Sequence, residues 1–185
     1  MDEVSLRAAN PEDIPALREL IAVSAHGLSV GDYTREQVDG ALGDAFGVDR
    51  QLIEDRTYFV IERAGELVAC GGWSFRKTLF GADTRARREP EKLDPARDAA
   101  KVRAFFVHPA HARLGLGTRL LEHCEQAARR AGFRRTELMS TLPGRRLYSR
   151  FGYRGDEEIE YELRGGLTMT FIPMVKTLDA ERHQK

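Results

Sequence analysis

A run of apolar residues followed by a helical repeat is the clearest pattern along this chain. Residues 102–107 are rich in β-branched and aromatic residues, which predicts a strand, and His108-Pro109 ends it because proline cannot donate to a strand ladder. After a short turn, apolar residues recur at helical spacing and predict a helix with one buried face; they are Leu116, Leu120, Leu121, Cys124, Ala127, Ala128 and Ala131. Gly132 stands where a glycine commonly ends a helix. The pattern predicts a strand–turn–helix unit over residues 101–132.

The first third of the chain predicts one strand and two helical regions. Residues 4–8 form a short strand, and Asn10 with Pro11 behind it predicts the start of a helix that Gly27 ends. Thr34 predicts the start of a second helical region, which extends to about residue 55. Glycines interrupt this second region, so we expect two pieces; they are Gly40, Gly43 and Gly47.

A hairpin and a long polar span are predicted next. Residues 57–62 and 66–75 are two strands, and the glycine turn at 63–65 joins them. Gly71-Gly72 inside the second strand predicts a bulge or the close approach of a neighbour. The span 76–100 mixes basic and acidic side chains, which is typical of a solvated loop. Its length leaves a lid over the functional site as an alternative.

The last third of the chain predicts a strand, a short helix and a strand pair. Residues 134–141 form the strand, and Pro143 opens a helix that Gly152 ends. Apolar residues then alternate with acidic ones, which predicts a half-buried strand; Ile159, Tyr161 and Leu163 face one way, and Asp156, Glu158, Glu160 and Glu162 face the other. Residues 167–175 predict its partner strand.

Candidate chemistry lies at the junction of the central strand and its helix. Gly115 and Gly117 carry no Cβ, so another molecule can approach the backbone closely. The first helical turn leaves N–H groups without partners, which suits a phosphate, and Arg113 and Thr118 add a charge and a hydroxyl. The pattern is neither the dinucleotide fingerprint GxGxxG nor a P-loop. Glycines that only let a helix pack tightly on a sheet are an equally good interpretation of the spacing.

Two motifs resemble the GCN5-related N-acetyltransferase (GNAT) superfamily. The first is FFVHPAHARLGLGTRLL, which is similar to the family's acetyl-CoA-binding segment, and the second is LYSRFGY at residues 147–153. One departure is Ala112, because the family often has Arg or Gln three residues before the first glycine. Arg113 follows and could supply that charge.

The resemblance implies a fold and a set of cofactor contacts. The fold is α/β (α+β): a twisted, mixed, mostly antiparallel sheet of six or seven strands, flanked by helices on both faces. Two central strands would splay apart and hold the pantetheine arm of acetyl-CoA. The implied cofactor-binding residues are Phe105, Phe106 and Val107 for the arm and Arg113, Leu114, Gly115, Leu116, Gly117 and Thr118 for the pyrophosphate.

The resemblance also implies catalytic and acceptor contacts. Tyr148 would protonate the departing thiolate, and the alternative is a tyrosine that only packs on its short helix. A main-chain N–H near Val107 would stabilise the oxyanion, and no general base is assigned. Tyr33 could line the acceptor cleft, and Glu158 and Glu160 would favour a cationic amine. The alternative for Tyr33 is a packing residue in a plain connector, and the alternative for Glu158 and Glu160 is a solvated strand face.

Composition narrows the class of protein. The length of 185 residues suits one domain, expected at 1–178 with a polar tail at 179–185. Basic and acidic residues balance at 29 each, so no global field favours nucleic acid or an anionic membrane. Cys70 and Cys124 lie in apolar elements, without the spacing of a metal site, and no signal sequence is recognised. We therefore expect a cytoplasmic protein that binds no metal.

Three functions are compatible with these patterns. The first is an acetyl-CoA-dependent N-acyltransferase that modifies a primary amine of a small molecule or protein, by direct attack in a ternary complex. The second is a non-catalytic acyl-CoA-binding or sensor module of the same fold, and the third is a mononucleotide-binding protein. Dimerisation is common in the resembled family, so a homodimer is an open alternative to a monomer.

Overall fold

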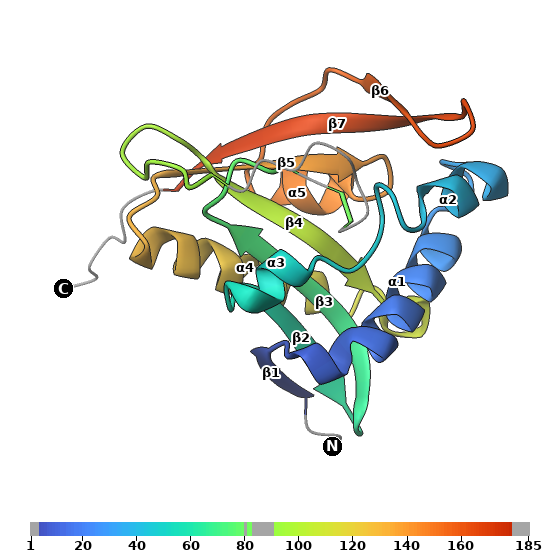
Figure 1. The fold of residues 1–185 in the computed structure, drawn as a ribbon, viewed down its shortest axis with the longest axis horizontal. Coiled ribbons are helices and arrows are strands. Elements are labelled where there is room, and N and C mark those ends of the chain that lie inside the picture. The colour runs from blue at the N-terminus through green and yellow to red at the C-terminus, as the bar shows by residue number, and fades with distance from the viewer. Residues whose placement is uncertain (1–3, 80, 83–90, 179–185) are drawn as a thin grey trace.

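A single seven-stranded sheet runs through the computed structural model, which describes residues 4–79, 81–82 and 91–178 (Figure 1). Its strands are β1 (Val4–Ala8), β2 (Tyr58–Arg63), β3 (Glu66–Ser74), β4 (Ala100–Val107), β5 (Arg135–Thr141), β6 (Ile159–Glu162) and β7 (Thr168–Thr177). The strand order is β1-β2-β3-β4-β5-β7-β6, and every pair of neighbours is antiparallel except β4 and β5. The predicted mixed, mostly antiparallel sheet is confirmed.

Helices cover both faces of this sheet. They are α1 (Ile14–Leu28), α2 (Arg35–Ala41), α3 (Arg50–Glu54), α4 (Leu116–Arg130) and α5 (Arg145–Arg150), with 3₁₀ turns at Pro11–Asp13 and Pro109–His111. On β2, Tyr58 and Val60 join the core under α1, α2 and α3, whereas Phe59 and Ile61 join the core under α4. Because alternate residues of a strand point to opposite faces, the two helical layers lie on opposite sides. None of the helices in the described ranges is long and apolar enough to span a membrane.

The end of α1 corrects one expectation. The helix continues through Gly27 to Leu28, so Gly27 is not its stop. A Cβ on Gly27 would lie 2.3 Å from Cγ of Pro109, which follows β4. The glycine is therefore a point of close approach, where a proline ring packs directly on the helix. It brings the end of α1 to the end of β4.

The two pieces of the second helical region are α2 and α3. Thr34 caps α2, since its Oγ1 accepts the N–H of Gln37 at 3.2 Å and Gln37 Oε1 accepts the N–H of Thr34 at 2.9 Å. Asp49 caps α3, because its Oδ1 accepts the N–H of Leu52 at 3.4 Å. Between the helices the chain packs Phe46 into the core, with 5% of its surface exposed.

The expected polar tail and part of the expected polar span lie outside the described residues. These are residues 80, 83–90 and 179–185. Within the span, Gly81 and Ala82 are described, and the Ala82 N–H donates to the Asp44 carbonyl at 2.6 Å. This bond places the span beside the segment that links α2 to α3.

Candidate active site

The two central parallel strands separate after a short paired stretch. Strands β4 and β5 pair only at Ala100 with Thr136 and at Lys101 with Glu137, where the two side chains form an ion pair. Beyond this point β5 continues to pair with β7 as far as Thr141. On its other edge, β4 stays paired with β3 as far as Val107. The strands therefore open a gap in the middle of the sheet, as the family resemblance implied.

A bulge in β4 lies beside this gap. The pairing of β3 with β4 shifts between Cys70–Phe106 and Gly72–Arg103, which leaves one extra residue on β4. Ala104 has a φ of +55°, a left-handed conformation that is uncommon for a residue with a Cβ. Its carbonyl accepts a hydrogen bond of 3.3 Å from the buried hydroxyl of Tyr58. The predicted irregularity at Gly71-Gly72 is confirmed, although the extra residue belongs to the facing strand.

A cavity lies in this gap, and five aromatic residues are among those that line it. Phe105, Phe106 and Arg103 line it from β4, and Met139 and Thr141 line it from β5. The remaining wall comes from four other segments and includes Phe46, Tyr148 and Phe171. Phe105 and Phe106 point to opposite faces of the sheet, since the first packs with the α4 core and the second with the α1 core. The cavity is thus lined by side chains from both faces of the sheet at the bulge.

Tyr148 stands on the cavity wall from helix α5. Its residue surface is 9% exposed, and its ring packs edge-on against Phe105 and Tyr153, with centroids 6.3 and 5.7 Å away. Burial raises the pKa of the Tyr148 hydroxyl above the ordinary tyrosine value. The side chain therefore keeps its proton at neutral pH, which is the state that a proton donor needs.

The main-chain N–H of Val107 has a partner that the sequence did not indicate. It donates to Oγ of Ser24 on α1 at 3.1 Å, and Ser24 is 4% exposed. A buried serine in an amphipathic helix gives no sequence signal of this contact. The group expected to serve as an oxyanion donor therefore has an acceptor within the protein.

The glycines at the start of α4 have different roles. Gly115 caps the helix with a φ of +80°, and a Cβ there would meet nothing within 4 Å. A Cβ on Gly117 would lie 3.2 Å from Cδ2 of Leu147 on α5. Gly115 is thus required by backbone conformation, whereas Gly117 permits close packing of two helices.

The N-terminus of α4 offers main-chain donors on an exposed loop. The first helical hydrogen bond runs from the Arg119 N–H to the Gly115 carbonyl, so the N–H groups before it point out of the helix. Arg113 and Leu114 are exposed, and Arg113 has a φ of +63°. Leu116 is buried and Thr118 half-buried, so these two anchor the turn. This end of the 15-residue helix carries partial positive charge, which suits a phosphate group.

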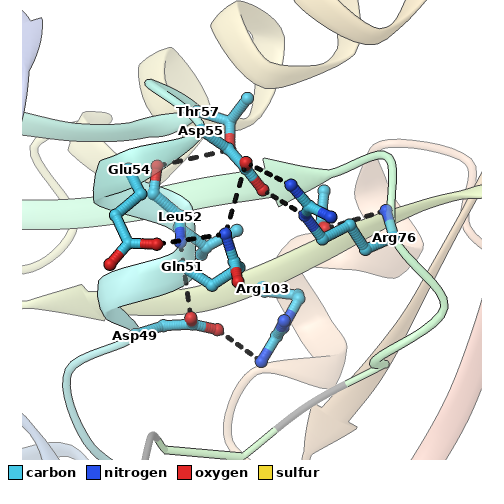
Figure 2. Close-up of polar contacts among 9 residues, drawn as sticks. Asp49, Gln51, Leu52, Glu54, Asp55, Thr57, Arg76 and Arg103 are labelled. Carbon is cyan, nitrogen blue, oxygen red and sulfur yellow. Dashed lines mark hydrogen bonds and ion pairs between the residues drawn. The ribbon is translucent and has the colours of Figure 1, made fainter. Parts of the chain in front are cut away.

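A buried ion pair connects the cavity wall to the start of α3. Arg103 and Asp49 have side chains that are 2% and 1% exposed, and Nη2 lies 2.5 Å from Oδ2. Figure 2 shows Arg103 extending from β4 toward Asp49 at the start of α3, with Arg76 and Asp55 forming a second pair nearby. Arg103 Nη2 also donates to the Gly81 carbonyl at 3.0 Å. The arginine therefore joins β4, α3 and the polar span at the cavity wall.

The three residues expected to contact the acceptor occupy different environments. Tyr33 is 9% exposed, and its hydroxyl lies between two backbone groups, the N–H of Leu142 and the carbonyl of Thr170. Glu158 and Glu160 are exposed, at the edge of the sheet on and before β6. The hydroxyl of Thr170 holds the pKa of Glu160 below its usual value through a hydrogen bond of 2.5 Å. Thr170 links two of them, because its carbonyl accepts from Tyr33 and its hydroxyl donates to Glu160. Contact of any of the three with a substrate stays a prediction.

His108 has a structural contact in the turn that follows β4. Nδ1 of His108 accepts the N–H of Ala110 at 3.2 Å, which caps the turn after β4. Within residues 4–79, 81–82 and 91–178, no group of three or more His, Cys, Asp or Glu side chains is placed to hold a metal ion.

Family comparison identifies the class of protein to which this site belongs. The model of the acetyltransferase (GNAT) family matches residues 28–153, which is more than half of the 185 residues. The chain therefore belongs to the GNAT acetyltransferase family, whose members are acyltransferases. The matched segment contains the strand bulge, the α4 N-terminus and Tyr148. A sequence comparison with curated proteins gives no match.

Solved structures share the whole fold at low sequence identity. A GCN5-related N-acetyltransferase from Rhodopseudomonas palustris is 17% identical, with a TM-score of 0.68 and coverage of 96% of this chain and 98% of its own. The PaiA N-acetyltransferase of Thermoplasma acidophilum, solved with coenzyme A, is 13% identical, with a TM-score of 0.64 and coverage of 95% and 99%. YncA of Salmonella typhimurium, solved with its cofactor acetyl-CoA, is 19% identical, with a TM-score of 0.62 and coverage of 99% and 98%. The expected fold is therefore confirmed.

Proposed function

We propose that this protein is an N-acetyltransferase that moves the acetyl group of acetyl-CoA to a primary amine of a small molecule or protein, by direct attack in a ternary complex. The observation that carries the proposal is the β4–β5 gap, which has Tyr148 on its wall and the α4 N-terminus beyond its open end. Two solved neighbours carry coenzyme A or acetyl-CoA, which supports the choice of co-substrate.

Two parts of this chain would bind the co-substrate. Backbone groups of Phe105, Phe106 and Val107 would hydrogen-bond the pantetheine arm along the edge that β5 leaves. Residues 113–118 would bind the pyrophosphate with main-chain N–H groups and the Arg113 side chain. The positive φ of Gly115 favours glycine, and because glycine has no side chain a phosphate can approach the backbone closely there.

Acetyl transfer then requires the movement of two protons. A neutral amine attacks the thioester carbonyl, its C–N bond forms, and a base or a water chain takes the proton that the amine loses. The C–S bond breaks, and the Tyr148 hydroxyl donates its proton to the departing thiolate. The pKa of Tyr148, raised by burial, keeps the hydroxyl protonated until that step. Main-chain N–H groups at the β4 bulge would stabilise the oxyanion as it develops.

The proposal also covers the binding of the acceptor amine, the cellular location of the protein and its oligomeric state. Glu158 and Glu160 would attract a cationic amine from the exposed edge of the sheet. Both cysteines are buried and free, which is compatible with the proposed cytoplasmic location. We include a homodimer, for which the measurement is light scattering coupled to size-exclusion chromatography.

A thermal-shift experiment tests the proposed co-substrate. A ligand that binds only the folded state raises the apparent melting temperature by mass action. We expect acetyl-CoA and coenzyme A to raise it and ATP at the same concentration to leave it unchanged. Release of thiol from acetyl-CoA in the presence of a panel of amines then identifies the acceptor. No shift with saturating acetyl-CoA would contradict the proposal, and a shift with ATP alone would favour a nucleotide-binding protein.

A further inference from the structure

The hydroxyl of Tyr33 occupies a place in the β5–β7 ladder. The last pair of this ladder is Thr141 with Phe171, so the next pair in the same register would be Leu142 with Thr170. At this position the Tyr33 hydroxyl accepts the N–H of Leu142 at 2.9 Å and donates to the carbonyl of Thr170 at 2.6 Å. A side chain from the segment between α1 and α2 therefore bridges two backbone groups that would otherwise be candidates for a direct hydrogen bond.

The Tyr33 hydroxyl makes both hydrogen bonds of this bridge and stays protonated at neutral pH. Tyr33 is buried, and burial raises its pKa to about 12. An O–H that donates and accepts at the same time meets both backbone groups, which would be costly to leave unpaired in the interior. Because two hydrogen bonds in series span more distance than one, the hydroxyl holds Leu142 and Thr170 further apart than a direct bond would.

Side chains of Tyr33 and of helix α2 contact the edge of β7 that β5 leaves. Two residues before Thr170 on the same edge of β7, the carbonyl of Thr168 accepts a hydrogen bond of 2.8 Å from Nε2 of Gln37. Tyr33 and Gln37 thus contact successive outward carbonyls of β7. Only Tyr33 also binds the chain that leaves β5, so the two residues form a natural pair for comparison.

The chain bound by Tyr33 leads directly to the cavity wall. After Leu142 it turns, and Oγ1 of Thr141 accepts the N–H of Gly144 at 3.1 Å. A Cβ on Gly144 would lie 3.3 Å from the ring of Tyr148, so the turn and that ring are in close contact. Any shift of Leu142 relative to β7 would consequently move the start of α5 and the ring of Tyr148.

We propose that Tyr33 is a positioning residue: its hydroxyl ends the β5–β7 ladder and sets the turn that presents Tyr148 to the cavity. The functional part of this inference rests on the proposed acetyl transfer. In a Tyr33→Phe variant the ring remains, but Leu142 and Thr170 lose their shared partner. The turn can then close onto β7, which displaces Tyr148, or stay in place with the Leu142 N–H unpaired, which leaves the turn and Tyr148 less firmly held.

The test compares the wild-type protein with Tyr33→Phe and Gln37→Leu. By hydrogen exchange and mass spectrometry, peptides that cover residues 142–148 should exchange about tenfold faster in Tyr33→Phe, as expected for the loss of one hydrogen bond, and at the wild-type rate in Gln37→Leu. For acetyl transfer from acetyl-CoA, kcat should fall about tenfold in Tyr33→Phe, while KM for acetyl-CoA changes by less than about twofold. Gln37→Leu should keep the wild-type kcat.

The exchange and kinetic measurements test different parts of the proposal for Tyr33. Unchanged exchange at residues 142–148 in Tyr33→Phe would refute the bridge, and faster exchange with unchanged kcat would refute the positioning role. Equal loss of kcat in both variants would indicate a general effect of docking α2. Absence of acetyl-CoA binding by the wild-type protein would overturn the proposed function instead, and the exchange comparison would still decide whether Tyr33 sets the turn.

Discussion

The main-chain N–H of Val107 at the end of β4 donates to Oγ of Ser24 on α1, although 83 positions separate the two residues. Val107 is the last residue of β4, the strand along which the proposed co-substrate would bind. A pantetheine carbonyl that accepts from Val107 would have to replace the serine hydroxyl. Ser24 is therefore a competitor for this N–H in the free protein.

Substitution of Ser24 by alanine should strengthen coenzyme A binding. The variant leaves the Val107 N–H without its internal acceptor, so the free state loses a hydrogen bond that the complex supplies again. We expect the Kd for coenzyme A, measured by titration calorimetry, to fall by up to about tenfold, since a hydrogen bond contributes about 1 kcal/mol. Ser24→Thr keeps a hydroxyl and should bind as the wild type. An unchanged or higher Kd in Ser24→Ala would show that Val107 does not bind the coenzyme through this N–H.

Substitution of Tyr148 by phenylalanine should separate chemistry from binding. The variant keeps the ring against Phe105 but cannot protonate the thiolate, so kcat should fall by about 100-fold. The Kd for coenzyme A should stay within about twofold of the wild type. Tyr153→Phe is the matched control, because that hydroxyl bonds Oγ1 of Thr136 at 2.9 Å and the variant should lose stability without losing kcat. Equal activity of Tyr148→Phe and wild type would identify Tyr148 as a packing residue.

Substitution of Ala104 by glycine should stabilise the protein. Ala104 has a φ of +55°, which costs a residue with a Cβ about 1–2 kcal/mol, and glycine removes most of this strain. After the greater chain entropy of glycine is subtracted, the free energy of unfolding in urea should rise by about 0.5–1 kcal/mol. Ala104→Val adds a β-branched side chain at the same φ and should lower it. The reverse order of the two variants would contradict the strain at the bulge.

Removal of the charge on Asp49 should destabilise the fold strongly. Asparagine keeps an oxygen to cap α3 but leaves the Arg103 guanidinium without a buried counter-ion, so the free energy of unfolding should fall by about 3 kcal/mol. The double variant Asp49→Leu with Arg103→Met removes both charges and should be more stable than Asp49→Asn. Chemical denaturation of the three proteins provides the measurement. A double variant less stable than the single one would mean that the pair is favourable in itself.

Acid should destabilise the N-terminal strand through Arg7. Its guanidinium donates to both carboxylate oxygens of Asp13, at 2.7 and 2.8 Å, and to Glu62 at 2.9 Å. These bonds hold the pKa of both carboxyl groups below their ordinary values, so their stabilising effect is present above about pH 4 and is lost as the pH falls through the lowered pKa values. The melting temperature should fall less between about pH 5 and pH 2 in Arg7→Met than in the wild type. Arg18→Met, at an exposed position on α1, should follow the wild-type curve.

Local patterns were sufficient for most elements and for the family. The strand at β4 and the helix at α4 follow from apolar spacing, from the proline that ends the strand and from the glycines at the ends of the helix, which are interactions within a few residues. Tyr148 could be selected because its motif stands in the expected order after the glycine turn. Gly27 shows where prediction from local pattern fails. A glycine near the end of a helix can either end the helix or allow another segment to pack closely, and here only the position of Pro109 shows that the second applies.

By itself, the sequence determined the order of strands and helices, the GNAT family, and a glycine turn suited to phosphate, because each depends on neighbours along the chain. The tertiary structure decided the contacts between distant segments. Ser24 with Val107, Asp49 with Arg103 and Tyr33 with Leu142 are 83, 54 and 109 positions apart. Nothing in the spacing of a buried serine, aspartate or tyrosine specifies its partner; each partner is selected when the packed sheet and helices bury both groups and require their polar atoms to pair.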